Sequence, residues 1–407
     1  MSKNIVVFMD GTSNQPSKKS PTNVELLFRA AKHDESGAQP QVTRYWTGVG
    51  TDITNGLLGG GASIFEQTLA QRAQLKPYLP KGTRWLRPIL GTTLGLGLAA
   101  RIKEAYAFIC EHYQRTRGDQ VYVFGFSRGA FAARSLAGFL SRVGTLLADK
   151  LHLVEAAYLI YEEGLDKDDT LLAGFLRDFA EASMLQNGDA PAAIRIHFLG
   201  LWDAVAALEF PLGRLRVRAE RTRHHQQDVP PNVFVARHAL ALHELRKKFE
   251  PEVWLSAGQS DLQQVWFPGA HADVGGGYAS GETGLADTAL RWMVDEATSR
   301  GFLLRPDAFS SGAPSAKSIL HHEIRHWFFL ATPTPRHALQ VMETDGIHAI
   351  SWEATMYFHH NVANHLSAQS DRPYAAWKKS ISEALTKVDQ VSARLFVLNW
   401  LKGRSPP

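Results

Sequence analysis

An α/β protein with a mostly parallel β-sheet flanked by helices is predicted from three features of the sequence. Several short apolar runs, rich in β-branched residues, end in Gly, Pro or Asp, as buried strands that end in turns do. Most of these runs are followed by stretches with helical periodicity, and this alternation favours parallel strands joined by crossover helices. One run ends in a glycine-flanked serine directly before a helix, which favours an α/β-hydrolase-like fold with lid or cap insertions.

The predicted elements follow one another along the chain at short spacing. Strands are predicted at residues 4–9, 42–46, 120–126, 194–201 and 262–267, and this is a minimum set. Helices are predicted at residues 24–32, 99–114, 129–143, 154–162, 171–184, 232–245 and 285–299. The last helix carries apolar side chains at four-residue spacing, which places them on one face: Leu285, Ala289, Met293 and Ala297.

Residues 1–305 are predicted to form the α/β-hydrolase domain, with two insertions. Residues 55–88 are glycine-rich and then helix-like, and residues 210–231 are basic and bounded by prolines. In sheet enzymes such excursions usually lie over the carboxyl ends of the strands, where ligands bind, so both are candidate lids. Residues 306–407 are expected to form a C-terminal cap or an accessory helical segment.

The composition is that of a folded protein. Of the 407 residues, 44% are hydrophobic and 21% are charged, which excludes the disordered, collagen-like and disulfide-scaffold classes. Cys110 is the only cysteine, so neither an internal disulfide nor a thiolate-rich metal site can form. The net charge of +4 is mild, and the one basic cluster, residues 214–225, lacks interleaved aromatics. We interpret it as a solvated loop, with an anion-binding patch as the alternative, and predict no nucleic-acid partner.

Neither an export signal nor a membrane span is predicted. The apolar stretch at residues 5–9 is shorter than the roughly 7 to 15 residues of a signal-peptide core. The stretch at residues 88–102 is interrupted by glycines and ends near Arg101, short of the roughly 20 apolar residues that span a bilayer. We therefore expect a protein that is cytoplasmic in the cell that makes it and at most peripheral to a membrane.

The strongest chemical signal is the serine turn Gly125-Phe126-Ser127-Arg128-Gly129. It follows the strand-like sequence VYVF and precedes a predicted helix, which is the context of a nucleophile elbow. The serine of such an elbow has a strained backbone, so Gly125 and Gly129 are predicted to provide the structural clearance of the turn. The alternative is an ordinary strand-to-helix turn with a buried serine.

A nucleophilic serine needs a histidine to take its proton and a carboxylate to orient that histidine. His271 follows a predicted strand inside a glycine-rich loop, and Asp203 ends another predicted strand. The order Ser127, Asp203, His271 is that of α/β-hydrolases. Asp273, two residues after His271, is the alternative acid, and we favour Asp203 over it.

The oxyanion of the reaction needs two hydrogen-bond donors. One is predicted to be the backbone amide of Arg128, and the other the amide of Gly11 or Thr12 in the loop after the first strand. Asp10 begins this loop, and an equally good interpretation is that its side chain simply caps a turn. No metal and no cofactor are required by this set of residues.

Several sequence blocks together resemble the type VI secretion phospholipase effector-like catalytic domain family, formerly a domain of unknown function. The blocks are FMDGTSN at residues 8–14, YWTGVGT at 45–51, VYVFGFSRGAFAARSLAG at 121–138, FLGLWDAV at 198–205, ALHELRKKFEPEVW at 241–254 and VWFPGAHADVGGGY at 265–278. They span roughly residues 4–300. The chain departs from the family pattern at Ala204, where Thr is usual, and at His243, where an acidic residue is usual; neither position is a member of the triad.

The resemblance implies an α/β-hydrolase fold and a triad of Ser127, Asp203 and His271 that hydrolyses carboxylic esters of glycerophospholipids. It also implies an antibacterial toxin that is injected into the periplasm of a target cell and has an immunity or secretion adaptor protein as partner. We expect a monomer that contacts membranes peripherally.

Two other functions fit parts of the sequence. A metal-dependent phosphoesterase would use Asp10, Asp203, His271 and Asp273 as ligands, but it leaves the serine turn without a role. A membrane-binding or partner-binding module on a hydrolase scaffold would need no chemistry, although the complete triad argues against it.

Overall fold

The structure is a computed structural model that describes residues 2–11, 19–48, 93–162, 174–175, 194–205, 228–246, 249–279, 281–306, 308–309, 321, 342–344, 347–349 and 356–358. Several predictions lie outside these ranges: the insertion at residues 55–88, most of the insertion at 210–231, the helix at 171–184 apart from residues 174–175, and most of the C-terminal segment. The division of the chain at residue 305 therefore stays a prediction.

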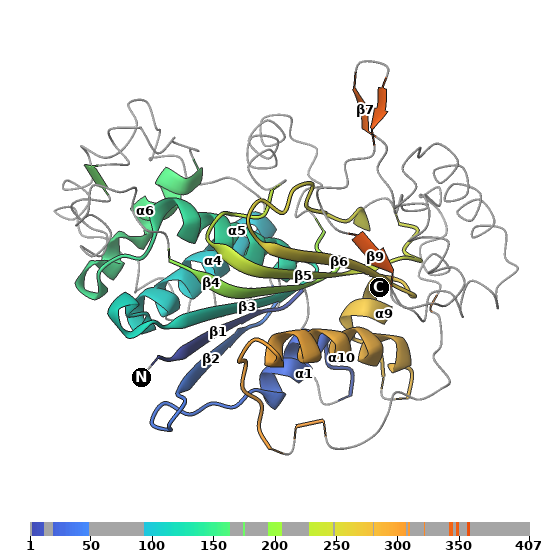
Figure 1. Ribbon diagram of the computed structural model, residues 1–407, viewed down its shortest axis with the longest axis horizontal. Helices are drawn as coiled ribbons and strands as arrows, with labels where there is room; N and C mark the ends of the chain where they lie inside the picture. Colours follow the sequence, from blue (N-terminus) through green and yellow to red (C-terminus); the bar gives the residue numbers. More distant parts are fainter. Residues whose placement is uncertain are drawn as a thin grey trace, which may run out of the picture.

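A twisted sheet of parallel strands forms the centre of the described part (Figure 1). Its strand order is β2-β1-β3-β4-β5-β6-β9, and every neighbouring pair is parallel. The strands are β1 Asn4–Met9, β2 Gln41–Trp46, β3 Gln120–Phe126, β4 Ile196–Trp202, β5 Val233–Ala241, β6 Asp261–Phe267 and β9 Met356–Phe358. Two short strands, β7 Met342–Thr344 and β8 Ile347–Ala349, form a separate antiparallel pair.

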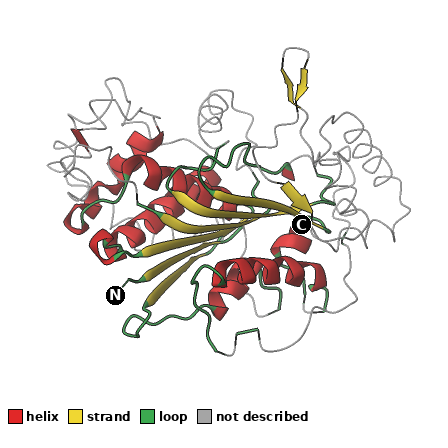
Figure 2. Ribbon diagram, viewed as in Figure 1, coloured by secondary structure: helices red, strands yellow, loops and turns green. Residues whose placement is uncertain are grey.

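Helices cover both faces of the sheet (Figure 2). One face carries α4 Thr93–His112, α5 Arg128–Val143 and α6 Val154–Glu162, and the other carries α1 Asn23–Ala30 and α10 Gly284–Thr298. Because side chains alternate along a strand, Ile5 and Val7 of β1 join the core under α5, whereas Val6 and Phe8 join the core over α1 and α10. None of the described helices is long and apolar enough to cross a bilayer.

The α/β architecture and all five predicted strands are confirmed, with boundaries that differ by at most two residues. The helices predicted at residues 24–32, 99–114, 129–143, 154–162 and 285–299 are also present, α4 beginning six residues earlier than predicted. The C-terminal segment differs from a purely helical cap, because Met356–Phe358 add strand β9 to the edge of the main sheet beside β6.

The helix predicted at residues 232–245 is wrong, because Val233–Ala241 form β5. This strand lies between β4 and β6 and is almost wholly buried. A parallel strand covered on both faces reads as a continuous apolar run without alternation, and its alanines and leucine also have high helix propensity. Pairing with two neighbouring strands overrides that local preference.

The chain reverses its direction of travel across the sheet between β1 and β3. From β1 the chain passes through α1 to β2 on one side, then crosses to β3 on the other side. The segment after β1 therefore leads to the face of the sheet that carries α1. The segment after β3 leads to the opposite face, which carries α5. In open parallel sheets ligands bind at such a switch point, outside the carboxyl ends of the strands. Asp10 and Ser127 both lie at this point.

The short helix α9 His271–Gly275, which follows β6, is held against α1 by the side chain of Asn23. The side-chain amide nitrogen of Asn23 donates to the carbonyl oxygens of Val274 at 2.8 Å and Ala286 at 3.0 Å. Asn23 is buried, so these two bonds satisfy carbonyls that water does not reach. This contact fixes the position of α9 relative to α1 and α10.

Replacing Asn23 with Ala should lower the free energy of unfolding by about 1 to 3 kcal/mol, because two buried carbonyls lose their donor. Urea unfolding followed by circular dichroism measures the change. Asn4→Ala is a matched control, since its amide also donates to a carbonyl, that of Gly301, but in an exposed position, and it should cost less. Equal losses in the two variants would contradict the role given to Asn23.

Candidate active site

Ser127 occupies a strained turn between β3 and α5. Its backbone angles are φ 57° and ψ −123°, outside the regions that non-glycine residues usually adopt. The turn is tight: a Cβ on Gly125 would lie 2.6 Å from the carbonyl oxygen of Gly129, and one on Gly129 would lie 2.2 Å from that of Met9. Both glycines are therefore required, as the sequence predicts, and the turn has the form of a nucleophile elbow.

His271 begins α9 and points its ring at the serine. Its Nε2 lies 2.8 Å from the Oγ of Ser127, and its Nδ1 lies 2.6 Å from Oδ2 of Asp203. A carboxylate only accepts hydrogen bonds, so Nδ1 carries the proton that it donates to Asp203. Nε2 of the neutral ring is then left as the acceptor of the serine hydroxyl, which is the tautomer that proton transfer requires.

Asp203 follows the last residue of β4 and has no exposed surface. Its second oxygen, Oδ1, accepts from the backbone amide of Ala241 at the end of β5, at 2.9 Å. Both carboxylate oxygens are thus fixed, and the positive φ of 39° at Asp203 turns its side chain toward His271. The structure brings together the three residues that the sequence places far apart, from the ends of β3, β4 and β6.

Asp273, the alternative acid, faces away from this set and bonds to another histidine. Its Oδ1 lies 2.6 Å from Nδ1 of His321, and its Oδ2 accepts from the backbone amides of Ala270 and His321. Burial raises the pKa of Asp273 above its usual range, while these bonds oppose the rise. The geometry therefore favours Asp203 as the partner of His271.

Local helix geometry accounts for this outcome. His271 and Asp273 both lie on the short helix α9. Residues two apart on a helix are separated by about 200° around its axis, so the two side chains point in opposite directions.

The loop after β1 begins with a dense hydrogen-bond network at Asp10. Its Oδ2 accepts from the hydroxyls of Thr22 at 2.6 Å and Tyr45 at 2.5 Å, and its Oδ1 accepts from the amide of Gly11 at 2.6 Å. Burial, followed by the charge of Asp10, raises the pKa of Tyr45, which stays a neutral donor. An oxyanion could take the Gly11 amide only in competition with Asp10; Thr12 lies outside the described residues.

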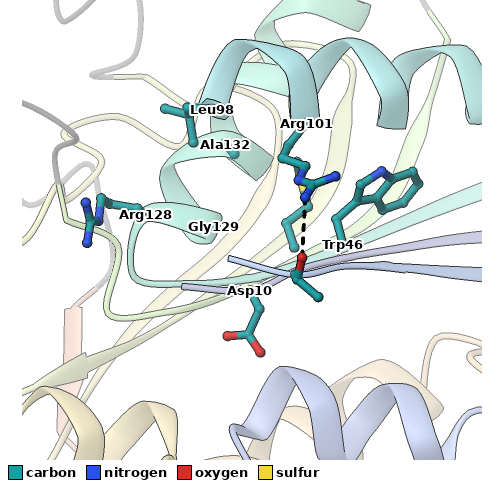
Figure 3. A pocket seen from close by; sticks show the side chains of 9 residues that line it. Asp10, Trp46, Leu98, Arg101, Arg128, Gly129 and Ala132 are labelled. Atoms are coloured by element: carbon teal, nitrogen blue, oxygen red, sulfur yellow. Dashed lines mark hydrogen bonds between the residues drawn. The ribbon is translucent and has the colours of Figure 1, made fainter. Parts of the chain in front are cut away.

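A small hollow, open to solvent, lies beside the elbow and is lined by residues of β1, β2, α4 and α5 and by residues that directly follow β1 and β2 (Figure 3). Its lining is mainly apolar and consists of Met9, Asp10, Trp46, Thr47, Leu98, Arg101, Arg128, Gly129 and Ala132. Arg101 is bonded to Thr47 and Glu104, whereas Arg128 extends away from them on the opposite side. Among the described residues, no partner of the Arg128 guanidinium is present, and burial lowers its pKa.

The sequence analysis did not single out the residues that surround the ring of His271. The ring packs against Phe126 and Phe249, with centroid separations of 4.7 and 4.8 Å. Glu244, which follows β5 in the chain and is buried, accepts from the backbone amide of His271 at 3.2 Å. Glu244 was not recognised because a helix was predicted at residues 232–245, and a helix there would not end at the carboxyl edge of the sheet.

The two departures from the family pattern leave these contacts intact. His243, where an acidic residue is usual, accepts the amide of Gly269 on its Nδ1 at 2.8 Å, a role that a carboxylate oxygen could also fill. Ala204 is buried, and its amide donates to Nε2 of His238 at 3.1 Å.

The four ligands of the alternative metal site do not converge. Asp10 bonds to Thr22 and Tyr45, and Asp273 bonds to His321, while only Asp203 and His271 contact each other. Within the described part of the chain, no group of three or more His, Cys, Asp or Glu side chains is arranged to hold a metal ion.

The sequence is similar to part of a yeast protein. An uncharacterized protein of Saccharomyces cerevisiae is 28% identical over 256 residues, which cover 61% of this chain and 32% of the yeast protein. The chain thus spans about a third of that relative.

Two solved structures are partly similar to this chain, at low sequence identity and low TM-score. An uncharacterized protein from Pseudomonas aeruginosa has a TM-score of 0.38 and 19% identity, over 77% of this chain and 48% of that one. A Tle1 effector bound to the VgrG spike of the type VI secretion system has a TM-score of 0.35 and 20% identity, over 68% and 51%. This chain spans about half of each.

The family comparison covers most of the chain and all of the site. The model of the catalytic domain of Tle1-like phospholipase effectors of the type VI secretion system matches residues 3–296, which include the elbow, Asp203 and α9. The chain therefore belongs to the family of Tle1-like phospholipase effector catalytic domains, a family of hydrolases.

Proposed function

We propose that this protein is a serine esterase that hydrolyses carboxylic esters of glycerophospholipids, an activity of the phospholipase A type. The observation that carries the proposal is the continuous hydrogen-bonded series from Ser127 through His271 to Asp203, with the serine on a strained elbow. A buried serine in an ordinary turn would need neither the strain nor two fixed partners.

The reaction begins when Nε2 of His271 takes the proton of the Ser127 hydroxyl as Oγ bonds to the acyl carbon. Asp203 stabilises the imidazolium that forms. The tetrahedral oxyanion is held by the amide of Arg128, the first of α5, and by a second amide from the loop after β1, at Gly11 or Thr12. Collapse breaks the ester C–O bond, and the imidazolium gives its proton to the departing lysophospholipid.

The second half of the reaction uses water in place of the lysophospholipid. His271 takes a proton from water while the oxygen attacks the acyl carbon that is bonded to Ser127. The new tetrahedral intermediate collapses to a free fatty acid and returns the proton to Oγ. These steps cleave the bond to an acyl carbon and leave the phosphoester bonds of the lipid intact.

The lining of the hollow supports a substrate that is apolar in one part and anionic in another. Met9, Trp46 and Leu98 offer an apolar wall beside the elbow. Arg128 is a half-buried cation next to the nucleophile, and within the described residues it has no carboxylate partner. A phosphate bound by this side chain would place an ester of the same lipid near Ser127.

The biological setting is proposed from the family alone. We propose that the protein is injected into the periplasm of a target cell as an antibacterial toxin, together with an adaptor or immunity protein. A monomeric state and peripheral membrane contact also stay predictions.

Ser127→Ala should abolish the release of fatty acid and lysophospholipid from mixed phospholipid vesicles, because no other group can form the acyl-enzyme. Mass spectrometry of the lipid products checks this result, and the wild type should be unaffected by a chelator. Wild-type turnover in the variant would contradict the proposal. Release of phosphate or head group that a chelator suppresses would favour the metal-dependent phosphoesterase.

Asp203→Asn should lower kcat by about 10⁴-fold, because the amide can hold the wrong tautomer of His271 and cannot stabilise the imidazolium. Asp273→Asn is the matched control, since this carboxylate also bonds to a histidine, and it should stay within about tenfold of the wild type. Both are measured on a soluble short-chain ester. The reverse ranking of the two variants would show that Asp273 is the acid.

Arg128→Met should lower kcat/KM for phospholipids by about 10- to 100-fold, because a charge-assisted bond to phosphate is lost. Hydrolysis of a neutral short-chain ester, which has no phosphate, should change by less than about threefold. Arg117→Met is the control, since Arg117 bonds to Asp119 at the opposite end of the sheet, and it should change neither activity. An equal loss on both substrates would remove Arg128 from phosphate recognition.

A further inference from the structure

A buried ion pair lies directly beside the base. The carboxylate of Glu244 receives two bonds from the guanidinium of Arg246, from Nε to Oε1 at 2.7 Å and from a terminal nitrogen to Oε2 at 2.7 Å. The same Oε2 lies 3.2 Å from the backbone nitrogen of His271. Glu244 is 1% exposed and Arg246 17% exposed, so water screens their charges poorly.

The arginine of this pair also reaches His271 by a second route. Its guanidinium carbon lies 3.7 Å from the centre of the Phe249 ring, and the edge of Phe249 packs on the ring of His271 at 4.8 Å. The side chain of Arg246 thus touches both groups that contact His271 from the chain segment after β5.

Other charged and titratable groups also surround His271. They are Asp203 after β4, Asp273 within α9, His321 bonded to Asp273, and His243, Glu244 and Arg246 after β5. Asp203 bonds to the ring itself, and Asp273 is engaged by His321. The remaining negative charge beside His271 is that of Glu244, and Arg246 opposes it.

We infer that Arg246 is a positioning residue that cancels the charge of Glu244 beside His271. The inference rests on the proposed function, because it concerns the base of that reaction. Without Arg246, the carboxylate of Glu244 would stabilise the imidazolium that forms in the reaction. Without the charge of Glu244, Arg246 would destabilise it. Each change should move the acid side of a pH profile by about one unit, since charges within a few ångströms have effects of this size.

The test is a pH profile of covalent labelling of Ser127 by a fluorophosphonate, followed by intact-protein mass spectrometry. Labelling needs neutral His271 but no lipid, so it reports the base directly. Arg246→Met should move the acid midpoint up by about one pH unit, and Glu244→Gln should move it down. The double variant should return to the wild-type midpoint. Met keeps the apolar stem on Phe249, which limits the change to the charge.

A matched ion pair at the other end of the sheet provides the control. Arg117 and Asp119 have the same spacing, with Nε to Oδ1 at 2.7 Å and a carboxylate side chain that has no exposed surface. Arg117→Met should leave the midpoint unchanged.

Absence of a midpoint change in Arg246→Met, or changes of the same sign in the two single variants, would overturn the inference. If Arg246→Met does not fold, Glu244→Gln alone tests the inference. An unchanged or raised midpoint in that variant contradicts the inference. A wild-type protein that does not react at any pH would instead overturn the proposed function, and this result is distinguishable from the others.

Discussion

The close contact between the end of β1 and the start of α5 is the constraint on which the rest of the site depends. Gly129 lies against the carbonyl oxygens of Met9 and Asp10, where no side chain would fit. This contact sets the backbone of Ser127, brings the first amides of α5 beside the loop after β1, and forms one edge of the hollow. The proposed nucleophile, the proposed oxyanion donors and the proposed substrate site therefore share one local geometry.

Buried polar contacts hold His271 against this fixed turn. Asp203 is held by the Ala241 amide, Asn23 holds α9 on α1, and Glu244 receives the His271 amide. Each of these groups is buried and hydrogen-bonded, which makes the position of His271 costly to change. Nε2 of His271 lies within hydrogen-bonding distance of the Ser127 hydroxyl, so the proposed base and nucleophile are held in the geometry that proton transfer needs.

Most of the fold and the three members of the proposed triad could be predicted from local sequence. The runs at β1, β3 and β6 are short, apolar and bounded by turn residues, and the serine turn has glycines at both required positions. β5 could not be recognised in this way, because it lacks alternation and its alanines and leucine have high helix propensity. The contacts that surround His271 were missed with it. Local sequence does not indicate the contact between His321 and Asp273, since the bond joins residues far apart in sequence.

Local sequence specified the strands that end in turns, the elbow and the chemical identity of Ser127, Asp203 and His271, because steric clearance and side-chain chemistry are properties of a few neighbouring residues. Only the tertiary structure decided which carboxylate orients His271, which amides bond to Asp10 and Asp203, and which ion pair lies beside the base. Those choices depend on the order of strands in the sheet and on the direction in which α9 presents its side chains, and both arise from packing between segments that are distant along the chain.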